Sequence, residues 1–325
     1  MPERPTLAEF EAAAERLKGV AVRTPLVPLH DYDASAAPDI FLKPETMQPV
    51  TSFKIRGVFN AVASLSDEER ARGVSTQSAG NTSQALGWVA RYFGVSARSI
   101  MPQSAPTSKV EASRAYGVTP VLLEAEPFWR YIQEAGWEGE PYAFIHPWTN
   151  RALMAGHGTI GLEIIADWPE VDTVYVPVGG GGLMGGVGSA LKALKPSVRV
   201  VGVEPEGCPA LHASFEAGEP VSVACSTMCD GVGVPFITEE NYPLLREVVD
   251  EVALVPEKAV KAAIKRLALR NKIIVEGAGA LSVAAALAAP ADERGTAVCV
   301  VTGGSIDSDK LTAILNDSTL DDYGR

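Results

Sequence analysis

The amino-acid sequence predicts an α/β fold in which most strands pair in parallel. From about residue 70, short apolar runs rich in β-branched residues alternate with segments of helical periodicity, as in a sheet covered by helices. Several runs are apolar at every position, a pattern typical of strands that are buried on both faces. The predicted strands span residues 74–78, 99–102, 118–123, 143–146, 173–178, 198–203 and 297–302.

Helices are predicted in the intervals between these strands. Apolar residues recur there at helical spacing, and the predicted helices span residues 82–93, 106–116, 152–166, 183–194, 256–270 and 278–289. The sequence has no internal repeat, no low-complexity segment and no long linker. A second domain is therefore expected as an insertion in the first, with a binding site at the carboxyl ends of the strands between them.

Composition and charge exclude several classes of protein. Of 325 residues, 46% are hydrophobic, which is enough to build a large core. The formal charge is −12, from 28 Lys and Arg against 40 Asp and Glu, and basic residues do not cluster, so no nucleic-acid partner is expected. The N-terminus lacks a signal-peptide pattern, and the apolar run 280–290 is too short to cross a bilayer. We therefore expect a cytoplasmic protein with no membrane partner.

The cysteines and histidines form no recognisable metal or disulfide pattern. Cys208, Cys225, Cys229 and Cys299 include no CxxC pair, and the four histidines are not at short metal-ligand spacing from them. Neither a zinc site nor a disulfide framework is expected. The cysteines are interpreted as small apolar residues of a protein in a reducing compartment.

A run of four glycines, Gly179 to Gly182, follows a predicted strand and precedes a predicted helix. Such a loop lets backbone N–H groups and the helix N-terminus close around a phosphate. A compact terminal phosphate is the favoured ligand. Two alternatives stay open: a tight structural turn, or a dinucleotide site in which Gly180, Gly182 and Gly185 form GxGxxG and Glu204 binds a ribose. The second alternative would make the protein an NAD-dependent oxidoreductase.

Lys54 is the candidate catalytic residue. It lies in TSFKIRG, after an aromatic residue and at the start of a helical run. A lysine that forms an imine must be deprotonated, which partial desolvation beside a cofactor favours. Taken alone, a lysine in this position is more often a solvated surface charge, so the assignment depends on the other motifs.

Motifs along the chain together resemble one family. TSFKIRG at 51–57, SAGN at 78–81 and GGGGL at 179–183 resemble the fold-type II pyridoxal-phosphate enzymes, specifically the serine/threonine dehydratase and serine racemase group. The likeness extends over nearly the whole chain through RTPL at 23–26, AGHGTIGLE at 155–163, VGVEPEG at 201–207, DGVGVP at 230–235, EGAGA at 276–280 and VTGGSID at 301–307.

The resemblance implies a fold and a domain division. The fold would be that of the tryptophan synthase β-like enzymes, an α/β architecture of two open, twisted and mostly parallel sheets with helices on both faces. Residues 1–68 and 147–325 would form a large cofactor-binding domain, and residues 69–146 a small inserted domain. Relatives are generally dimers or larger, so a homodimer is expected. Little chain follows VTGGSID, so no regulatory domain is expected.

The resemblance also implies how pyridoxal 5′-phosphate is held. Lys54 would carry it as a Schiff base, Phe53 would lie against its ring, and Asn81 would hydrogen-bond its 3′-oxygen. The glycine loop and Leu183 would hold the phosphate, while Thr302 would place a neutral hydroxyl at the pyridine nitrogen. The implied cofactor contacts are therefore Phe53, Lys54, Asn81, Gly179, Gly180, Gly181, Gly182, Leu183 and Thr302.

The implied substrate contacts lie in one loop and at one arginine. The loop's backbone donors and hydroxyls would bind the substrate carboxylate through Ser78, Ala79, Gly80 and Thr82. Racemases of the group have a serine base where this chain has Ala79, so elimination is favoured over racemisation. Arg130 falls where racemase-like relatives have an arginine facing the pocket, and would favour an acidic substrate. An ordinary surface arginine is the alternative.

Glu204 resembles the carboxylate ligand of a divalent-cation site in the racemase group. The backbone carbonyl of Cys208 would be a second ligand, and oxygen ligands of this kind suit Mg²⁺, Mn²⁺ or Ca²⁺. The second acidic ligand of the group is replaced by Ala210. A strand-end carboxylate without a metal is therefore an equal alternative.

The predicted activity is the dehydration and deamination of a small β-hydroxy amino acid, an ammonia-lyase reaction of class EC 4.3.1. The Lys54 amine would take the Cα proton, the β-hydroxyl would leave, and hydrolysis would give a 2-oxo acid and ammonia. L-threonine and L-serine are the expected substrates, with hydroxyaspartate as a third candidate. The alternatives are a serine or aspartate racemase, a β-replacement enzyme, a non-catalytic pyridoxal-phosphate protein and the oxidoreductase.

Overall fold

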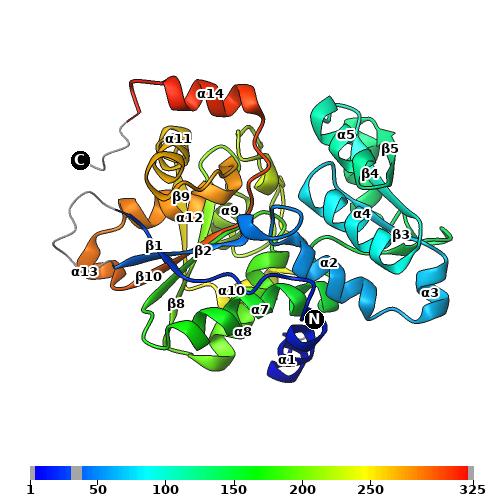
Figure 1. The fold of residues 1–325 in the computed structure, drawn as a ribbon, viewed down its shortest axis with the longest axis horizontal. Helices are drawn as coiled ribbons and strands as arrows, with labels where there is room; N and C mark the ends of the chain where they lie inside the picture. Colours follow the sequence, from blue (N-terminus) through cyan, green and yellow to red (C-terminus); the bar gives the residue numbers. More distant parts are fainter. Residues whose placement is uncertain (1–3, 31–38, 321–325) are drawn as a thin grey trace.

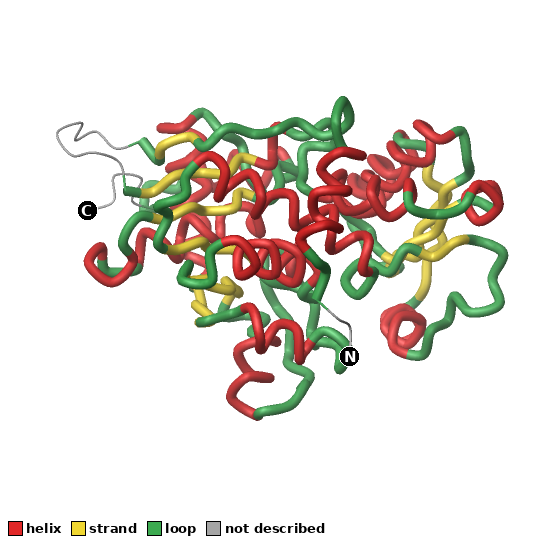
Figure 2. The backbone as a smooth tube through the Cα atoms, turned by 90° about the horizontal axis from the view of Figure 1, so that it is seen from below, coloured by secondary structure: helices red, strands yellow, loops and turns green. Residues whose placement is uncertain are grey.

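The computed structural model describes residues 4–30 and 39–320. The described chain forms two lobes, each built around its own sheet (Figure 1). The larger lobe contains a six-stranded sheet, and the smaller lobe, cyan in Figure 1, contains a four-stranded sheet. In Figure 2, helices flank the strands of the larger lobe on both sides. The predicted α/β architecture of two mostly parallel sheets is confirmed.

The larger sheet has its last strand in the middle. Its order is β1-β2-β10-β7-β8-β9, in which β1 is antiparallel to β2 and the other neighbours are parallel. Ala297 of β10 is in register with Ile40 of β2 on one side and with Thr173 of β7 on the other. The strands of this sheet are β1 (Val27–Pro28), β2 (Ile40–Pro44), β7 (Thr173–Pro177), β8 (Arg199–Pro205), β9 (Glu251–Val255) and β10 (Ala297–Val301).

The smaller sheet is parallel throughout and has the order β5-β4-β3-β6. All of its strands fall within residues 69–146, the range predicted for an inserted domain, although the domain boundaries themselves stay a prediction. The strands of this sheet are β3 (Val74–Gln77), β4 (Ala97–Pro102), β5 (Val118–Leu123) and β6 (Ala143–Phe144).

Helices connect and cover the strands of both sheets. None of the helices in the described residues is long and apolar enough to cross a membrane. The α-helices are α1 (Leu7–Arg16), α2 (Lys54–Ala63), α3 (Asp67–Ala71), α4 (Asn81–Phe93), α5 (Thr107–Ala115), α6 (Ala125–Gln133), α7 (Arg151–Asp167), α8 (Gly182–Leu194), α9 (Ala210–Ala217), α10 (Tyr242–Val248), α11 (Glu257–Arg266), α12 (Gly277–Ala288), α13 (Ala291–Arg294) and α14 (Ser308–Asn316). The 3₁₀-helices are η1 (Glu45–Met47) and η2 (Asp230–Val232), and η3 (Leu267–Asn271) is a π-helix.

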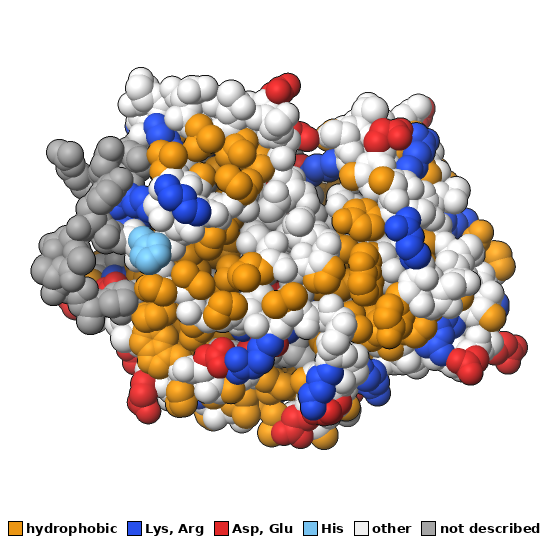
Figure 3. Space-filling model, in the orientation of Figure 1, with side chains coloured by type: hydrophobic (Ala, Val, Ile, Leu, Met, Phe, Trp, Pro, Cys, Tyr) orange, Lys and Arg blue, Asp and Glu red, His pale blue; other side chains and the backbone are white. Residues whose placement is uncertain are grey.

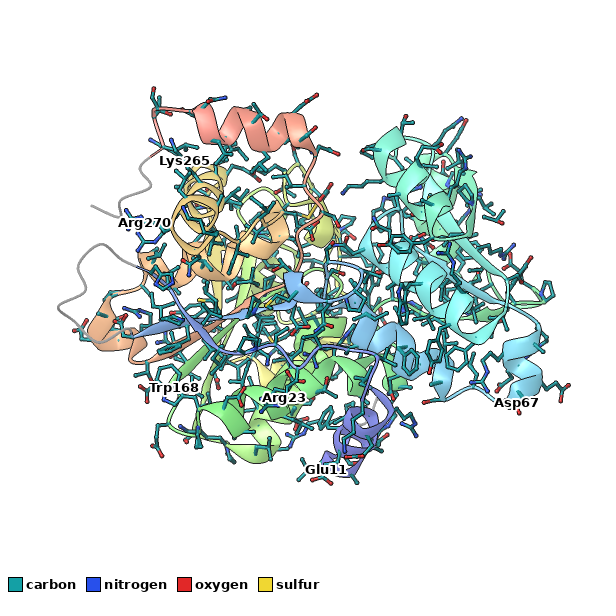
Figure 4. All side chains as sticks on the ribbon, viewed as in Figure 1. Glu11, Arg23, Asp67, Trp168, Lys265 and Arg270 are labelled. Atoms are coloured by element: carbon teal, nitrogen blue, oxygen red, sulfur yellow. A yellow bond between two sulfur atoms is a disulfide. The ribbon has the colours of Figure 1, made fainter. Side chains whose placement is uncertain are left out.

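The strands of the larger sheet bury both faces because their side chains alternate between two apolar clusters. In β10, Val298 and Val300 join the cluster formed with α7, α8 and α10, whereas Cys299 joins the cluster formed with α11 and α12. In Figure 1, α7 and α8 accordingly lie below the sheet, and α11 and α12 lie above it. Trp168, labelled in Figure 4, extends the first cluster and meets Phe41 edge-on at a centroid distance of 4.4 Å.

Helix α2 joins the two lobes, because it packs against α7 of the larger lobe and α4 of the smaller lobe. Two glycines allow α2 and α7 to approach closely. A Cβ at Gly156 would lie 2.3 Å from the carbonyl oxygen of Arg56, and a Cβ at Gly57 would lie 2.3 Å from the His157 ring. Because α2 begins at Lys54, this contact fixes where Lys54 lies.

Four charged side chains beside α2 form a buried group that we call the ion cluster: Lys43, Glu45, Arg56 and Glu163. Arg56 donates from Nε to Glu45 at 2.7 Å and from Nη1 to Glu163 at 2.6 Å. Lys43 Nζ donates to Glu163 at 2.5 Å and to the Thr24 carbonyl at 2.6 Å. Every charge in the cluster therefore has an opposite charge within hydrogen-bonding distance, as buried charges require.

The structure adds three strands and a disulfide to the sequence predictions. The sequence patterns do not predict β1, β2 or β9. β9 is an edge strand with an exposed Glu251 and half-buried neighbours, so it is not a continuous apolar run. The expectation of four free cysteines is wrong, because Cys208 and Cys225 form a disulfide. Cys229 and Cys299 are free and buried.

Candidate active site

A cavity of about 330 Å³ opens between the two lobes. Its lining includes the residues that follow β3, β7 and β10, so it lies at the carboxyl ends of strands from both sheets. Figure 3 shows the surface notched at the top, between the two lobes. The predicted site residues that line this cavity are Phe53, Lys54, Ser78, Ala79, Gly80, Asn81, Thr82, Gly179, Gly180, Gly181, Gly182, Leu183 and Thr302.

Lys54 is the first residue of α2 and extends into the cavity. Protein surrounds its side chain, which is only partly accessible to water from the cavity. Burial lowers the pKa of Lys54 to about 8, and the nearby Glu276 carboxyl opposes this shift. Its Nζ lies 4.9 Å from the centroid of the Phe53 ring and makes no hydrogen bond or ion pair with the described residues. Burial therefore favours loss of the Lys54 proton at a pH well below that of an ordinary lysine.

The glycine loop connects β7 to the N-terminus of α8. Gly181 has φ +91°, in the left-handed region that favours glycine. A Cβ at Gly180 would lie 2.2 Å from a ring carbon of Trp148, so the tryptophan ring can rest directly on the loop. The Asn241 side-chain amide donates to the Gly180 carbonyl at 2.8 Å, which holds the loop in place. The loop and the first turn of α8 present backbone donors of the kind that bind a phosphate.

Asn81 begins α4 and faces a carboxyl group that carries no role in the sequence prediction. Asn81 Nδ2 donates to Glu276 Oε1 at 2.7 Å. Burial raises the pKa of Glu276 to about 7, with the charge of Asp230 adding to the shift. Glu276 is the first residue of the EGAGA motif, so its position was visible in the sequence, but a motif does not reveal which atoms its side chain meets.

Phe53 lies between the cavity and a buried histidine. Its backbone N–H donates to the Thr302 carbonyl at 3.0 Å, which links two of the predicted site residues. Its ring meets the His157 ring edge-on at a centroid distance of 4.7 Å. Burial lowers the pKa of His157 well below its usual value, and the charges of Lys54 and Arg56 add to this effect. His157 is therefore a neutral support for Phe53.

Two contacts that were not predicted join the lobes, one of them at the cavity. Lys109 on α5 forms an ion pair with Asp230 of η2, and both residues line the cavity. The hydroxyl of Ser108 donates to Asp307 Oδ1 at 3.0 Å. Such contacts join residues more than a hundred positions apart, and no local pattern in the sequence indicates them.

Arg130 does not face the cavity, which corrects its prediction as a substrate contact. It lies on α6 with its side chain 55% exposed and its guanidinium 3.6 Å from the carboxylate of Glu126. On the same helix, Phe128 and Ile132 are the buried residues. A residue midway between them points away from the buried face, because two positions correspond to about 200° of rotation around a helix. The alternative, an ordinary surface arginine, describes this position.

The Glu204 carboxylate accepts hydrogen bonds at the N-terminus of α9. Its two carboxylate oxygens accept the backbone N–H groups of Leu211 and His212 at 2.8 and 2.9 Å, in the first turn of α9. Burial raises the pKa of Glu204 to about 7, and these backbone donors oppose the shift. Cys208 is cross-linked to Cys225. Residues 4–30 and 39–320 contain no group of three or more His, Cys, Asp or Glu side chains that could hold a metal ion.

Comparisons with known proteins identify the family. Residues 17–303 match the family of pyridoxal-phosphate dependent enzymes. The chain is 40% identical to the L-threonine ammonia-lyase of Thermotoga maritima over 96% of this chain and 78% of that protein. It is 38% identical to the L-threonine dehydratase catabolic TdcB of Escherichia coli K12 over 93% of both chains. The chain therefore belongs to the pyridoxal-phosphate dependent enzyme family.

Solved structures give the same result. Maize serine racemase superposes with a TM-score of 0.87 at 32% identity, over 95% of this chain and 96% of that chain. The processed form of threonine deaminase isoform 2 from Solanum lycopersicum superposes with a TM-score of 0.85 at 30% identity, over 98% of this chain and 96% of that chain. The resemblance to the dehydratase and racemase group and the predicted fold class are both confirmed.

Proposed function

We propose that this protein binds pyridoxal phosphate through Lys54 and removes water and ammonia from L-threonine and related β-hydroxy amino acids. One observation carries the proposal: a buried lysine with a pKa of about 8 shares a cavity with Asn81 and with the glycine loop at the N-terminus of α8. Relatives over nearly the whole chain are named L-threonine ammonia-lyase and L-threonine dehydratase, which supports this choice of reaction.

The residues present fit the cofactor of the family. The glycine loop borders the cavity without side chains of its own, and the N-terminus of α8 favours the negative charge of a phosphate. Phe53 offers a ring face, and the Thr302 hydroxyl offers a neutral partner for a ring nitrogen. When bound, pyridoxal phosphate supplies an electron-withdrawing ring that stabilises negative charge at the substrate Cα.

The side chains of this chain supply binding and proton transfer. The loop Ser78 to Thr82 leads into the N-terminus of α4, where backbone N–H groups and the helix dipole favour a substrate carboxylate. Gly80 N–H donates to the Ser78 hydroxyl at 3.1 Å, which shapes the loop. Lys54 takes the Cα proton, because a pKa of about 8 leaves a useful fraction of neutral amine near neutral pH. After release, the unsaturated product hydrolyses in water to a 2-oxo acid and ammonia.

Elimination is favoured over the two main rivals by specific residues. Ala79 lines the cavity without a hydroxyl, so it offers no second base to return a proton to the opposite face, as a racemase needs. Glu204 already accepts two backbone N–H groups of α9. This contact disfavours the dinucleotide interpretation, in which the Glu204 carboxylate would bind a ribose.

The test combines a spectrum with a product assay. The purified protein should show a visible imine band that borohydride abolishes, and should convert L-threonine to 2-oxobutanoate and ammonia. Lys54→Ala should lack the band and lose turnover by about 10⁴-fold or more. Lys18→Ala, at an exposed lysine paired with Glu15, should retain both. Full turnover by Lys54→Ala, or a protein that stays colourless with added cofactor, contradicts the proposal, and inversion of L-serine without oxo acid indicates a racemase.

The oligomeric state, the cellular location and a metal site are also part of the proposal. A homodimer and a cytoplasmic location rest on the family resemblance and on the absence of a signal-peptide pattern. A Mg²⁺, Mn²⁺ or Ca²⁺ site at Glu204 and the Cys208 carbonyl would require the carboxylate to exchange at least one of its backbone partners for the cation. Equilibrium dialysis with each cation, comparing wild type with Glu204→Gln, measures that site directly.

A further inference from the structure

Aromatic rings that the proposed mechanism does not use line part of the cavity. Phe128 and Trp129 on α6 and Trp148 after β6 line it, and Phe236 contacts both tryptophans. We call these four residues the aromatic wall. Its rings meet edge-on, with centroid distances of 5.0 Å for Phe128 and Trp129, 5.6 Å for Trp129 and Phe236, and 5.9 Å for Trp148 and Phe236. The aromatic wall therefore crosses from the smaller lobe to the larger lobe.

Both ends of the aromatic wall are anchored beside binding loops. At one end, the Gln77 side-chain amide donates to the Phe128 carbonyl at 2.8 Å, and Gln77 directly precedes Ser78 of the carboxylate-binding loop. At the other end, the Trp148 ring lies against Gly180 of the glycine loop. A substrate held between these two loops therefore lies alongside the aromatic wall.

The tryptophans of the aromatic wall keep ring surface open to the cavity. Trp129 and Trp148 are half-buried, whereas Phe128 and Phe236 are buried. The rings are fixed by their edge-on contacts, so a ligand that covers them gains apolar burial without having to order them. An apolar substituent is the ligand group that this surface favours.

The charges of the cavity disfavour an acidic substituent. Lys54 is committed to the cofactor in the proposed function, and Lys109 is paired with Asp230. Arg130 lies outside the cavity on the exposed side of α6. Asp230 and the buried Glu276 place two carboxyl groups in the lining. A second substrate carboxylate would therefore meet carboxyl groups and, among the described lining residues, no free cation, which argues against hydroxyaspartate.

We infer that the cavity accepts neutral β-hydroxy amino acids whose β-carbon carries an apolar group, up to an aryl ring, and that Trp129 determines this preference. The inference rests on the proposed elimination. For 3-phenylserine the reaction breaks the Cα–H and Cβ–O bonds, releases water, and takes water back on hydrolysis. The net products are phenylpyruvate and ammonia, and no oxidant or reductant is needed.

The first experiment compares kcat/KM for L-serine and for the L-threo forms of threonine, 3-phenylserine and 3-hydroxyaspartate by the release of 2-oxo acid. 3-Phenylserine and threonine should exceed serine by tenfold or more, because a hydrophobic pocket discriminates by about 10–200-fold per apolar group. 3-Hydroxyaspartate should fall below serine. Trp129→Ala should lower kcat/KM for 3-phenylserine by at least tenfold and change that for serine by less than threefold.

Trp137 is the matched control. It lies in the same lobe, is half-buried like Trp129, and stacks on Phe144 at a centroid distance of 4.3 Å without lining the cavity. Trp137→Ala should leave the ratio of the 3-phenylserine and serine values unchanged. Trp129→Leu, which keeps an apolar side chain, provides a second variant if Trp129→Ala does not fold, and should lower the same ratio by a smaller factor.

A binding measurement separates recognition from turnover. L-phenylalanine and L-alanine lack the β-hydroxyl and cannot undergo the elimination, so calorimetry on the holoenzyme reports their affinity alone. Phenylalanine should bind at least tenfold more tightly than alanine, and Trp129→Ala should remove most of that difference. Turnover of threonine without turnover of 3-phenylserine, or an equal loss for serine and 3-phenylserine in Trp129→Ala, overturns the inference. Failure of all four substrates instead overturns the proposed function.

Discussion

Lys43 and Lys54 show how one residue type takes two different roles in a protein interior. Lys43 is fully buried and donates to Glu163 and to the Thr24 carbonyl. Lys54 lies eleven positions further along the chain, has no such partner among the described residues, and has a pKa lowered to about 8 by burial. Burial also lowers the pKa of Lys43, but the Glu163 carboxylate opposes that shift and pairs with the charged amine. Lys43 is thus an ion-paired charge, whereas Lys54 has no ion-pair partner among the described residues that would retain its proton. The presence of an ion-pair partner, more than burial, therefore distinguishes a structural lysine from a reactive one.

The largest effect is expected at the ion cluster. Lys43→Met should lower the free energy of unfolding by about 3–5 kcal/mol, because it leaves Glu163 buried with fewer partners. Urea unfolding measures this loss. Turnover per cofactor-loaded molecule should stay within about twofold of wild type, and a large loss of turnover in folded protein would show that Lys43 also serves the cavity. Lys18→Met, at an exposed pair, should change stability by less than about 0.5 kcal/mol.

A smaller loss of stability is expected when the disulfide of the larger lobe is broken. Cys208 and Cys225 are separated by 17 positions, and a loop of that size contributes about 3 kcal/mol. Reduction with dithiothreitol should lower the unfolding free energy by this amount. Cys225→Ser should show the same loss and no further response to dithiothreitol. Equal stability of the oxidised and reduced proteins would mean that the cross-link stabilises nothing.

Replacement of Lys54 should change the free energy of unfolding in the opposite direction. In apo protein at pH 7, Lys54→Met should raise the unfolding free energy by about 1–3 kcal/mol, because burial disfavours the charged amine. Below pH 8 the amine is charged in both the folded and unfolded states, so the gain is full. As pH rises from 8 toward the ordinary lysine pKa of 10.5, the folded amine is neutral and the gain disappears. A gain independent of pH would contradict the lowered pKa.

The smallest effect is expected from a change at Glu276, whose charge opposes the lowering of the Lys54 pKa. Glu276→Gln keeps the size of the side chain that faces Asn81 and removes the charge that raises the pKa of Lys54. The rate of cofactor uptake by apo protein should be half-maximal near pH 8 in wild type and roughly half a unit to one unit lower in the variant. A shift to higher pH would mean that Glu276 does not stabilise the charged amine.

The sequence predicted the residues that line the cavity better than the contacts that surround them. Lys54, Asn81 and the glycine loop belong to ordered motifs, and the structure brings all of them to one cavity. The continuously apolar strands were also predicted, because burial on both faces leaves a clear pattern. β5 has the predicted bounds, Val118–Leu123.

The features that the sequence did not predict depend on long-range contacts or helix phase. Burial and the charge of Asp230 raise the pKa of Glu276. Both effects depend on residues outside the EGAGA motif. The disulfide joins cysteines without a spacing motif, and the aromatic wall joins rings from both lobes. Arg130 was misplaced because its match to an arginine of racemase-like relatives does not give the rotation of its helix.

The order of strands in the larger sheet has a consequence for biosynthesis. β10 lies between β2 and β7, yet among the described strands it is the last to be synthesised. Until Ala297 has been made, β2 and β7 each keep an unpaired edge, and the apolar faces that β10 completes stay open. Exposed edges and apolar surface of this kind promote aggregation. A nascent chain that stalls before this point therefore leaves those strand edges exposed, and we expect a gene truncated there to yield no folded larger lobe.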